Sequence, residues 1–197
     1  MMRTVFVPSV RRALWAGAFV ALTLVCATTS ATAQNAATDN ASISRKIFLA
    51  DLDELQSKFV ALAEAIPAEK YSWRPAPGVR SIGEAFQHVA SEYYTYSPIA
   101  FGAAPSPVIG KGPEAFQKFE SASTKPDVLR HLKEGFAYGK QAIAGVDSAT
   151  LAGKIKWFGR DLSTAETSHS MAGDLHEHLG QLIAYARMNG VKPPWTK

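Results

Sequence analysis

The residues best suited to chemistry lie near the C-terminus, in the segment 174–181, which reads Asp-Leu-His-Glu-His-Leu-Gly-Gln. Asp174 and His178 stand four residues apart. On a helix that turns by ~100° per residue they share one face about a turn apart, as two ligands of one metal ion must. His176 lies two residues from His178, or ~200° around the helix, so in a regular helix these two imidazoles cannot hold the same ion.

A second pair with helical spacing stands earlier in the chain. His88 and Glu92 are again four residues apart, and helical bundles build metal sites from inward-facing ligands on different helices. His88 together with Asp174 and His178 would supply three ligands and leave a fourth position open, which suits Zn²⁺ or Ni²⁺. We expect Glu92 either to orient His88 or to act as a catalytic general base.

Each of these residues also has a structural interpretation. His88 fits a hydrogen-bonded histidine at a helix interface, while Asp174 and Glu92 fit solvated helix residues. Four further residues are expected to be structural or to lie on the surface: His131, His169, His176 and Glu177. The sequence holds no nucleophile elbow, P-loop or dinucleotide fingerprint.

Four helices are predicted to position these side chains. Apolar residues recur at helical spacing, and capping boxes at Ser81 with Glu84 and at Ser163 with Glu166 mark two helix starts. Prolines or glycines mark the ends. The predicted helices begin near residues 43, 81, 124 and 163 and end before Pro67, at Pro98, near Gly145 and at Asn189-Gly190. Without convincing strand alternation, this pattern predicts an all-α four-helix bundle.

The connections between these helices vary in how clearly they can be interpreted. Prolines and glycines exclude regular structure from residues 71–80 and 101–113, and a short helix is expected near residues 114–120. Residues 147–162 fit no pattern, and the piece 155–159 is consistent with an extended segment or a turn. The long connections permit a bundle other than up-down-up-down.

The N-terminus is typical of a secretory signal peptide, residues 1–33. Three arginines precede the apolar run 13–27, and small residues follow up to Ala33, where cleavage is expected. An uncleaved anchor is the alternative, but the run falls short of the ~20 apolar residues that span a bilayer. We therefore expect a periplasmic or secreted protein with a disordered tail at residues 34–42 and one domain at residues 43–195.

Composition narrows the chemistry of the exported chain. The only cysteine, Cys26, lies in the leader, so the mature protein has no thiol or disulfide. The leader also takes three of the 21 Lys and Arg residues and none of the 17 acidic ones, which leaves the rest almost neutral. Because nucleic-acid binding needs a basic patch, we expect no nucleic-acid partner, and no stable membrane association after cleavage.

Three segments together resemble the DinB-like, YfiT-type superfamily of four-helix metal-binding proteins. They are residues 71–84, His88-Val89-Ala90, and residues 178–191 followed by Pro193-Pro194. The resemblance implies an up-down-down-up bundle that is often dimeric. It also implies one histidine ligand on the second helix and two ligands a turn apart on the fourth, the later one just before x-Gly-Gln.

On this chain the implied ligands are His88, Asp174 and His178, with Asp174 where relatives usually have histidine. This departure leaves the identity of the metal open. Known relatives include transferases that use thiols such as bacillithiol or mycothiol, and metal-dependent hydrolases or isomerases. Because such thiols are chiefly cytosolic, export favours hydrolysis or simple binding.

The leading hypothesis is an exported protein that binds a divalent metal, Zn²⁺ or Ni²⁺, and acts as a hydrolase or transferase on an unidentified small molecule. In this hypothesis Glu92 is the catalytic base. The alternative is a non-catalytic, small-ligand-binding bundle whose metal site has degenerated at Asp174. The resemblance also makes a homodimer the expected assembly.

Overall fold

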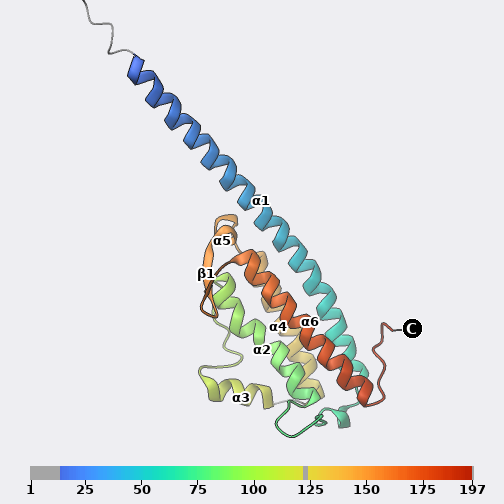
Figure 1. Cartoon of the computed structure of the whole chain (residues 1–197). Coiled ribbons are helices and arrows are strands. Elements are labelled where there is room, and N and C mark those ends of the chain that lie inside the picture. The colour runs from blue at the N-terminus through green and yellow to red at the C-terminus, as the bar shows by residue number, and fades with distance from the viewer. Residues whose placement is uncertain (1–13, 122–123, 197) are drawn as a thin grey trace, which may run out of the picture. The chain divides into compact units, whose positions relative to one another are not determined.

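The computed structural model describes residues 14–121 and 124–196 of the chain (Figure 1). It divides the chain into two compact units, residues 1–39 and 40–197. The elements, in chain order, are α1 (Leu14–Ala65), η1 (Ala68–Lys70), α2 (Ile82–Phe101), α3 (Pro113–Ser121), α4 (Lys125–Ala144), α5 (Ser148–Ala152), β1 (Lys154–Trp157), β2 (Arg160–Ser163) and α6 (Thr164–Met188).

Helix α1 begins earlier than the apolar periodicity from Ile43 indicates. It starts at Leu14 and includes residues 34–42, for which the sequence predicts a disordered tail. Within residues 14–121 and 124–196, no helix is long and apolar enough to cross a membrane. The signal peptide and its cleavage after Ala33 stay predictions, and residues 1–13 lie outside the described ranges.

Helices α1 and α4 run antiparallel in the bundle. Phe59 of α1 packs on Phe136 of α4 with ring centroids 5.8 Å apart. Further toward the start of α1, Asp53 pairs at 2.7 Å with Lys140, which lies further toward the end of α4. The interior between the helices is apolar, and α1 contributes several side chains that are fully buried: Leu55, Phe59, Leu62 and Ala63.

Helices α2 and α4 run parallel and approach each other closely. Gln87 meets His131 at 2.9 Å, and further along both helices the ring of Tyr93 lies against Gly139. A Cβ atom at Gly139 would collide with that ring, and one at Gly135 would lie 3.0 Å from a backbone oxygen of α2. The two glycines, four residues apart on one face of α4, therefore permit this approach.

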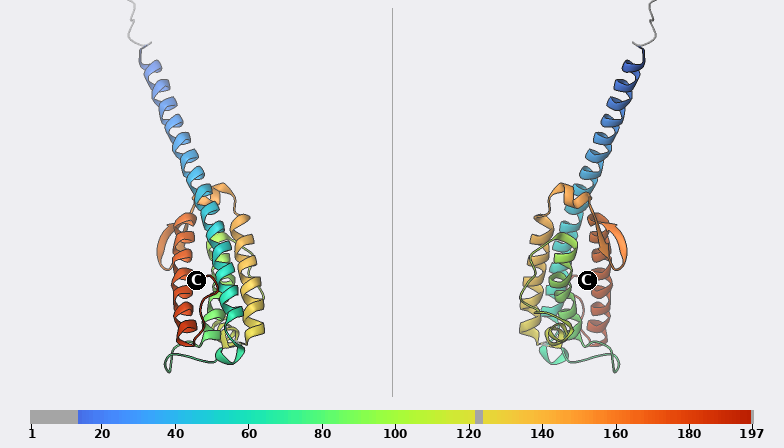
Figure 2. Two further views of the ribbon diagram at one scale, coloured as in Figure 1. Left: turned by 90° about the vertical axis from the view of Figure 1, so that its right-hand side faces the viewer. Right: turned by 90° about the vertical axis from the view of Figure 1, so that its left-hand side faces the viewer.

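The long helices of residues 40–197 make an up-down-down-up bundle in which α3 lies on the connection from α2 to α4 (Figures 1 and 2). Such a crossover is what allows consecutive long helices to run parallel. The all-α prediction is confirmed, with one addition. Strands β1 and β2 form an antiparallel hairpin that pairs Trp157 with Arg160.

A helix of only five residues, α5, followed by the hairpin explains why residues 147–162 show no helical periodicity. Phe158 and Gly159 form its two-residue turn, and both have positive φ, 46° and 80°. Two central residues with positive φ are typical of type I′ turns, whose twist matches that of the flanking strands. The segment is therefore both an extended piece and a turn, and it leads directly into α6.

The helix ends follow the sequence signals with one correction. Helix α2 does not end at Pro98 but continues to Phe101, where Gly102 with φ 65° forms the cap. The proline loses one backbone donor, but the helix continues through it for three more residues. Gly190 with φ 76° follows α6 as predicted, and the Val191 N–H donates to the Ala186 carbonyl at 2.9 Å.

Candidate metal centre

Two capping boxes fix the starts of the helices that carry the candidate ligands. The Ser81 hydroxyl accepts the Glu84 N–H at 3.2 Å, and the Ser163 hydroxyl accepts the Glu166 N–H at 3.2 Å. In both boxes the glutamate side chain in turn accepts the serine N–H. These local bonds set the positions at which α2 and α6 begin.

Three side chains from α2 and α6 converge on one point. Oε1 of Glu92 lies 3.3 Å from Nε2 of His88 and 3.2 Å from Nε2 of His178. One ligand atom from each of the three residues lies within 4.8 Å of the others. The two imidazole planes are inclined by 82°, so each ring approaches the carboxylate from its own direction.

The donor set fits a divalent metal ion. In a tetrahedral site with bonds of about 2.0–2.1 Å, neighbouring ligand atoms are about 3.3–3.4 Å apart. The two Glu92–histidine separations agree with that spacing. Two imidazoles and one carboxylate also form a ligand set that catalytic zinc enzymes use, with further positions left open.

Both histidines also form a hydrogen bond to another side chain through their other ring nitrogen, Nδ1. Nδ1 of His88 bonds to the carboxylate of Glu120, which lies on α3. Nδ1 of His178 bonds to Oε1 of Gln181 at 3.3 Å, and Nε2 of Gln181 donates to the Tyr185 hydroxyl at 3.0 Å. Partners at Nδ1 fix the tautomer that leaves Nε2 free to bind a metal.

The charges in the cluster are coupled. Burial raises the pKa of Glu92, and the charge of Asp174 adds to that rise, although His178 opposes it. The hydrogen bond that His178 donates to Glu92 raises the pKa of His178, against the effect of burial. A cation bound at Oε1 of Glu92 and Nε2 of His178 would take the place of this hydrogen bond.

Glu120 differs from Glu92 in the direction of its pKa shift. Burial opposes ionisation here too, but the hydrogen bond and charge of His88, together with Arg80, lower the pKa of Glu120. Nε of Arg80 lies 3.4 Å from this carboxylate. Glu120 is therefore an ionised acceptor at His88, whereas Gln181 is a neutral one at His178.

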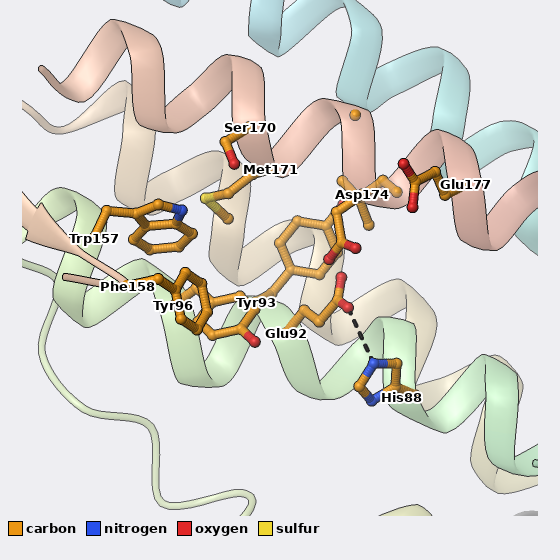
Figure 3. Close-up of a pocket in the computed structure, with 12 residues that line it drawn as sticks. His88, Glu92, Tyr93, Tyr96, Trp157, Phe158, Ser170, Met171, Asp174 and Glu177 are labelled. Carbon is orange, nitrogen blue, oxygen red and sulfur yellow. Dashed lines mark ion pairs between the residues drawn. The ribbon is translucent and has the colours of Figure 1, made fainter. Parts of the chain in front are cut away.

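Asp174 lies beside the cluster. Its Oδ1 is 3.8 Å from Nε2 of His178, and its side chain is 47% exposed, whereas that of Glu92 is 6% exposed. The structure thus brings Glu92, expected as a base, between the histidines, and leaves Asp174, expected as a ligand, at the edge. Both carboxylates face the space between α2 and α6 (Figure 3).

The other histidines lie away from this cluster. His176 is 52% exposed and pairs with Asp51 of α1 at 3.1 Å. His131 is buried and bonded to Gln87, and His169 is exposed. These positions agree with the structural or superficial roles expected for them.

A pocket of about 430 Å³ opens beside the cluster. His88, Glu92 and Asp174 line one end, and Tyr96, Trp157 and Phe158 line the other (Figure 3). Trp157 and Phe158, on the β-hairpin, were not among the site residues inferred from the sequence. The pair Phe158-Gly159 between two short segments is the only signal for a turn that could bring them here.

Comparisons with known proteins agree with this fold. The sequence profile described as the DinB superfamily matches residues 51–182, more than half of the chain. A crystal structure of a DinB-like protein from Bacillus subtilis is 18% identical, with a TM-score of 0.57, over 73% of this chain and 91% of that one. One from Bacillus cereus is 14% identical, with a TM-score of 0.58, over 76% and 95%. A search of curated proteins finds no match.

Proposed function

We propose that this chain, which belongs to the DinB superfamily, binds a divalent metal ion through His88, Glu92 and His178. The observation that carries the proposal is the position of Oε1 of Glu92, within 3.3 Å of Nε2 of both histidines. A buried carboxylate lies between two imidazoles, and each imidazole is hydrogen-bonded to another side chain through Nδ1. Metal sites have this arrangement.

Zn²⁺ and Ni²⁺ are the ions that best suit this donor set, because imidazole accepts either and the carboxylate completes the set. A bound ion would polarise a carbonyl or phosphoryl oxygen of a small substrate. Asp174 lines the pocket beside the ligands, with Oδ1 3.8 Å from Nε2 of His178, and in this proposal its carboxylate accepts a proton from the attacking group. This assignment supports a metal-dependent hydrolase or transferase.

The alternative of a non-catalytic bundle with a degenerate metal site depended on Asp174 as the third ligand. With Glu92 among the ligands, the donor set no longer depends on the position where Asp174 replaces the usual histidine. The predicted leader places the activity in the periplasm or outside the cell. Sequencing the N-terminus of the exported protein tests that part, with Gln34 as the expected first residue.

Metal analysis of the purified mature protein tests the metal site. Wild type is expected to carry Zn²⁺ or Ni²⁺ in near-equal molar amount, and a His88→Ala/His178→Ala variant is expected to carry neither. A His169→Ala/His176→Ala variant removes two exposed histidines and should keep the metal. Equally low metal in wild type and the His88/His178 variant would refute the proposal.

Thermal unfolding gives an independent measurement. A ligand that binds only the folded state raises the Tm, and a chelator reverses the rise. We expect this behaviour in wild type and in the His169→Ala/His176→Ala control. A melting temperature that changes neither with added metal nor with chelator would instead support the non-catalytic alternative.

A further inference from the structure

We propose that the pocket beside the metal centre binds a small organic cation, with its ammonium group against Tyr96, Trp157 and Phe158. The inference names the class of ligand for the site described above and in that sense rests on the proposed function. Three features of the pocket carry it: the arrangement of the rings, the exposure of Phe158 and the charges on the wall.

The three rings meet edge to face. Ring centroids lie 5.2 Å apart for Tyr96 and Trp157, 5.8 Å for Tyr96 and Phe158, and 5.1 Å for Trp157 and Phe158. The corresponding interplanar angles are 68°, 77° and 79°. Rings so inclined form a corner whose faces point in different directions, and π faces are what attract an ammonium group.

Phe158 is in a position that stability alone does not favour. The residue is 76% exposed, and its φ of 46° lies in the left-handed region. The turn it occupies normally takes Asn, Asp or Gly, and positive φ is unfavourable for a bulky residue. Phenylalanine here gains little from burial and strains the backbone, which is typical of a residue that serves binding.

The pocket wall is acidic. Glu92, Asp174 and Glu177 contribute carboxylates, and among the described residues that line it none is Lys or Arg. A divalent ion at the metal centre would neutralise the charge of Glu92 and leave one positive charge. The two carboxylates of Asp174 and Glu177 together exceed that charge. The field in the pocket therefore attracts cations and repels anionic substrates.

The two ends of the pocket suit a ligand with two different groups. In Figure 3 Tyr96, Trp157 and Phe158 lie at the end away from His88, with Met171 beside Trp157, and Glu92 and Asp174 lie between that end and His88. The cavity of about 430 Å³ is of the size that admits a small metabolite. An ammonium group at the aromatic end places the rest of such a molecule toward the metal ligands.

Calorimetric titration with choline and with its neutral isostere, in which tert-butyl replaces trimethylammonium, tests the charge preference. The metal-loaded wild type is expected to bind choline about tenfold tighter than the isostere. Phe158→Ala should weaken choline binding by a similar factor and change isostere binding less. Glu177→Gln should reduce the preference for choline. Trp195→Ala, at a partly exposed tryptophan outside the pocket lining, is the matched control and should change neither.

Equal affinity for the two probes, no choline binding by metal-loaded wild type, or unchanged binding in Phe158→Ala would overturn the inference. Phe158 is exposed, so its replacement should leave the fold intact, and circular dichroism checks this. Metal content measured on the same samples separates the two proposals. Choline selectivity without metal refutes only the metal site, and metal without choline binding refutes only the ligand class.

Discussion

Helices α2 and α6 each carry a histidine and a carboxylate four residues apart, and the two pairs have different environments. In α2 the pair is His88 and Glu92, and in α6 it is Asp174 and His178. The histidines are similarly covered, with side chains 16% and 18% exposed. The carboxylates differ, since Glu92 is 6% exposed and Asp174 is 47% exposed.

The difference arises from what lies around each carboxylate. Oε1 of Glu92 lies within 3.3 Å of Nε2 of both His88 and His178, while Oδ1 of Asp174 is 3.8 Å from His178 at the edge of the pocket. A buried carboxylate must be compensated by hydrogen bonds or charge, and the two imidazoles compensate Glu92. A half-exposed carboxylate such as Asp174 needs no such compensation. In the proposed site, the same spacing supplies a ligand on one helix and a base on the other.

Exchange of each carboxylate for its amide should separate these roles. We expect Glu92→Gln to weaken Zn²⁺ binding by more than the roughly 100-fold that loss of a supporting hydrogen bond can cause. Asp174→Asn should stay within about tenfold of wild type, because its loss affects only the surroundings of the ligands. Competition titration against a chromophoric chelator measures both affinities.

The opposite order of the two affinities would contradict these roles. If Asp174→Asn loses the metal and Glu92→Gln keeps it, Asp174 is the third ligand and Glu92 the base, as spacing and family resemblance predict. His176→Gln is the matched control, since this half-exposed histidine on α6 pairs with Asp51 and should not affect the metal.

The hydrogen-bond partners of Nδ1 in the two histidines differ as well. Glu120 places a charged acceptor at His88, and Gln181 a neutral one at His178. Glu120→Gln should reduce metal affinity by about 10–100-fold, because a carboxylate partner makes the imidazole a stronger ligand. Gln181→Glu should raise affinity, since Tyr185 can turn its hydroxyl to donate. The same titration measures both, and equal effects of the same sign would contradict this account.

How far the sequence predicts this molecule depends on how local each signal is. The helix starts at Ser81 and Ser163 and the end at Gly190 depend on a few neighbouring residues, and the structure confirms them. The hairpin has strands of four residues each, too short for alternation to distinguish from a loop. Its aromatic residues therefore could not be assigned to the pocket.

The roles of the carboxylates depend on contacts between distant segments. Glu92 is the buried carboxylate in a position where His178, which lies more than eighty residues later on α6, meets it at 3.2 Å. Glu120 reaches His88 from α3 across 32 residues of sequence. Spacing identifies both His–carboxylate pairs, but the choice between them depends on burial that only the assembled bundle defines.

The close packing behind α2 predicts opposite effects for two glycine substitutions. Gly139→Ala forces a methyl group against Tyr93 and should cost about 1–3 kcal/mol of unfolding free energy. In a domain of this size that lowers the Tm by roughly 2–4 °C per kcal/mol. Gly180→Ala on α6 meets no atom of the described residues within 4 Å and should stabilise the helix by up to about 1 kcal/mol. Thermal unfolding with chelator compares them, and equal losses would show that α6 is packed as tightly as α2.

The smallest expected effect comes from His131, a buried histidine with no carboxylate bonded to its ring in the described structure. Burial lowers the pKa of His131 below its usual value of about 6.5, with a contribution from Arg130. Between the lowered pKa and about 6.5 the unfolded chain binds more protons than the folded one, so stability is lost as the pH falls through this window. His131→Gln stays neutral and can still bond to Gln87, so its Tm should fall less than that of wild type between about pH 7.5 and pH 5.5. Measurement with chelator excludes the metal ligands from the comparison. A parallel decline in both proteins would mean that burial does not suppress the charge of His131.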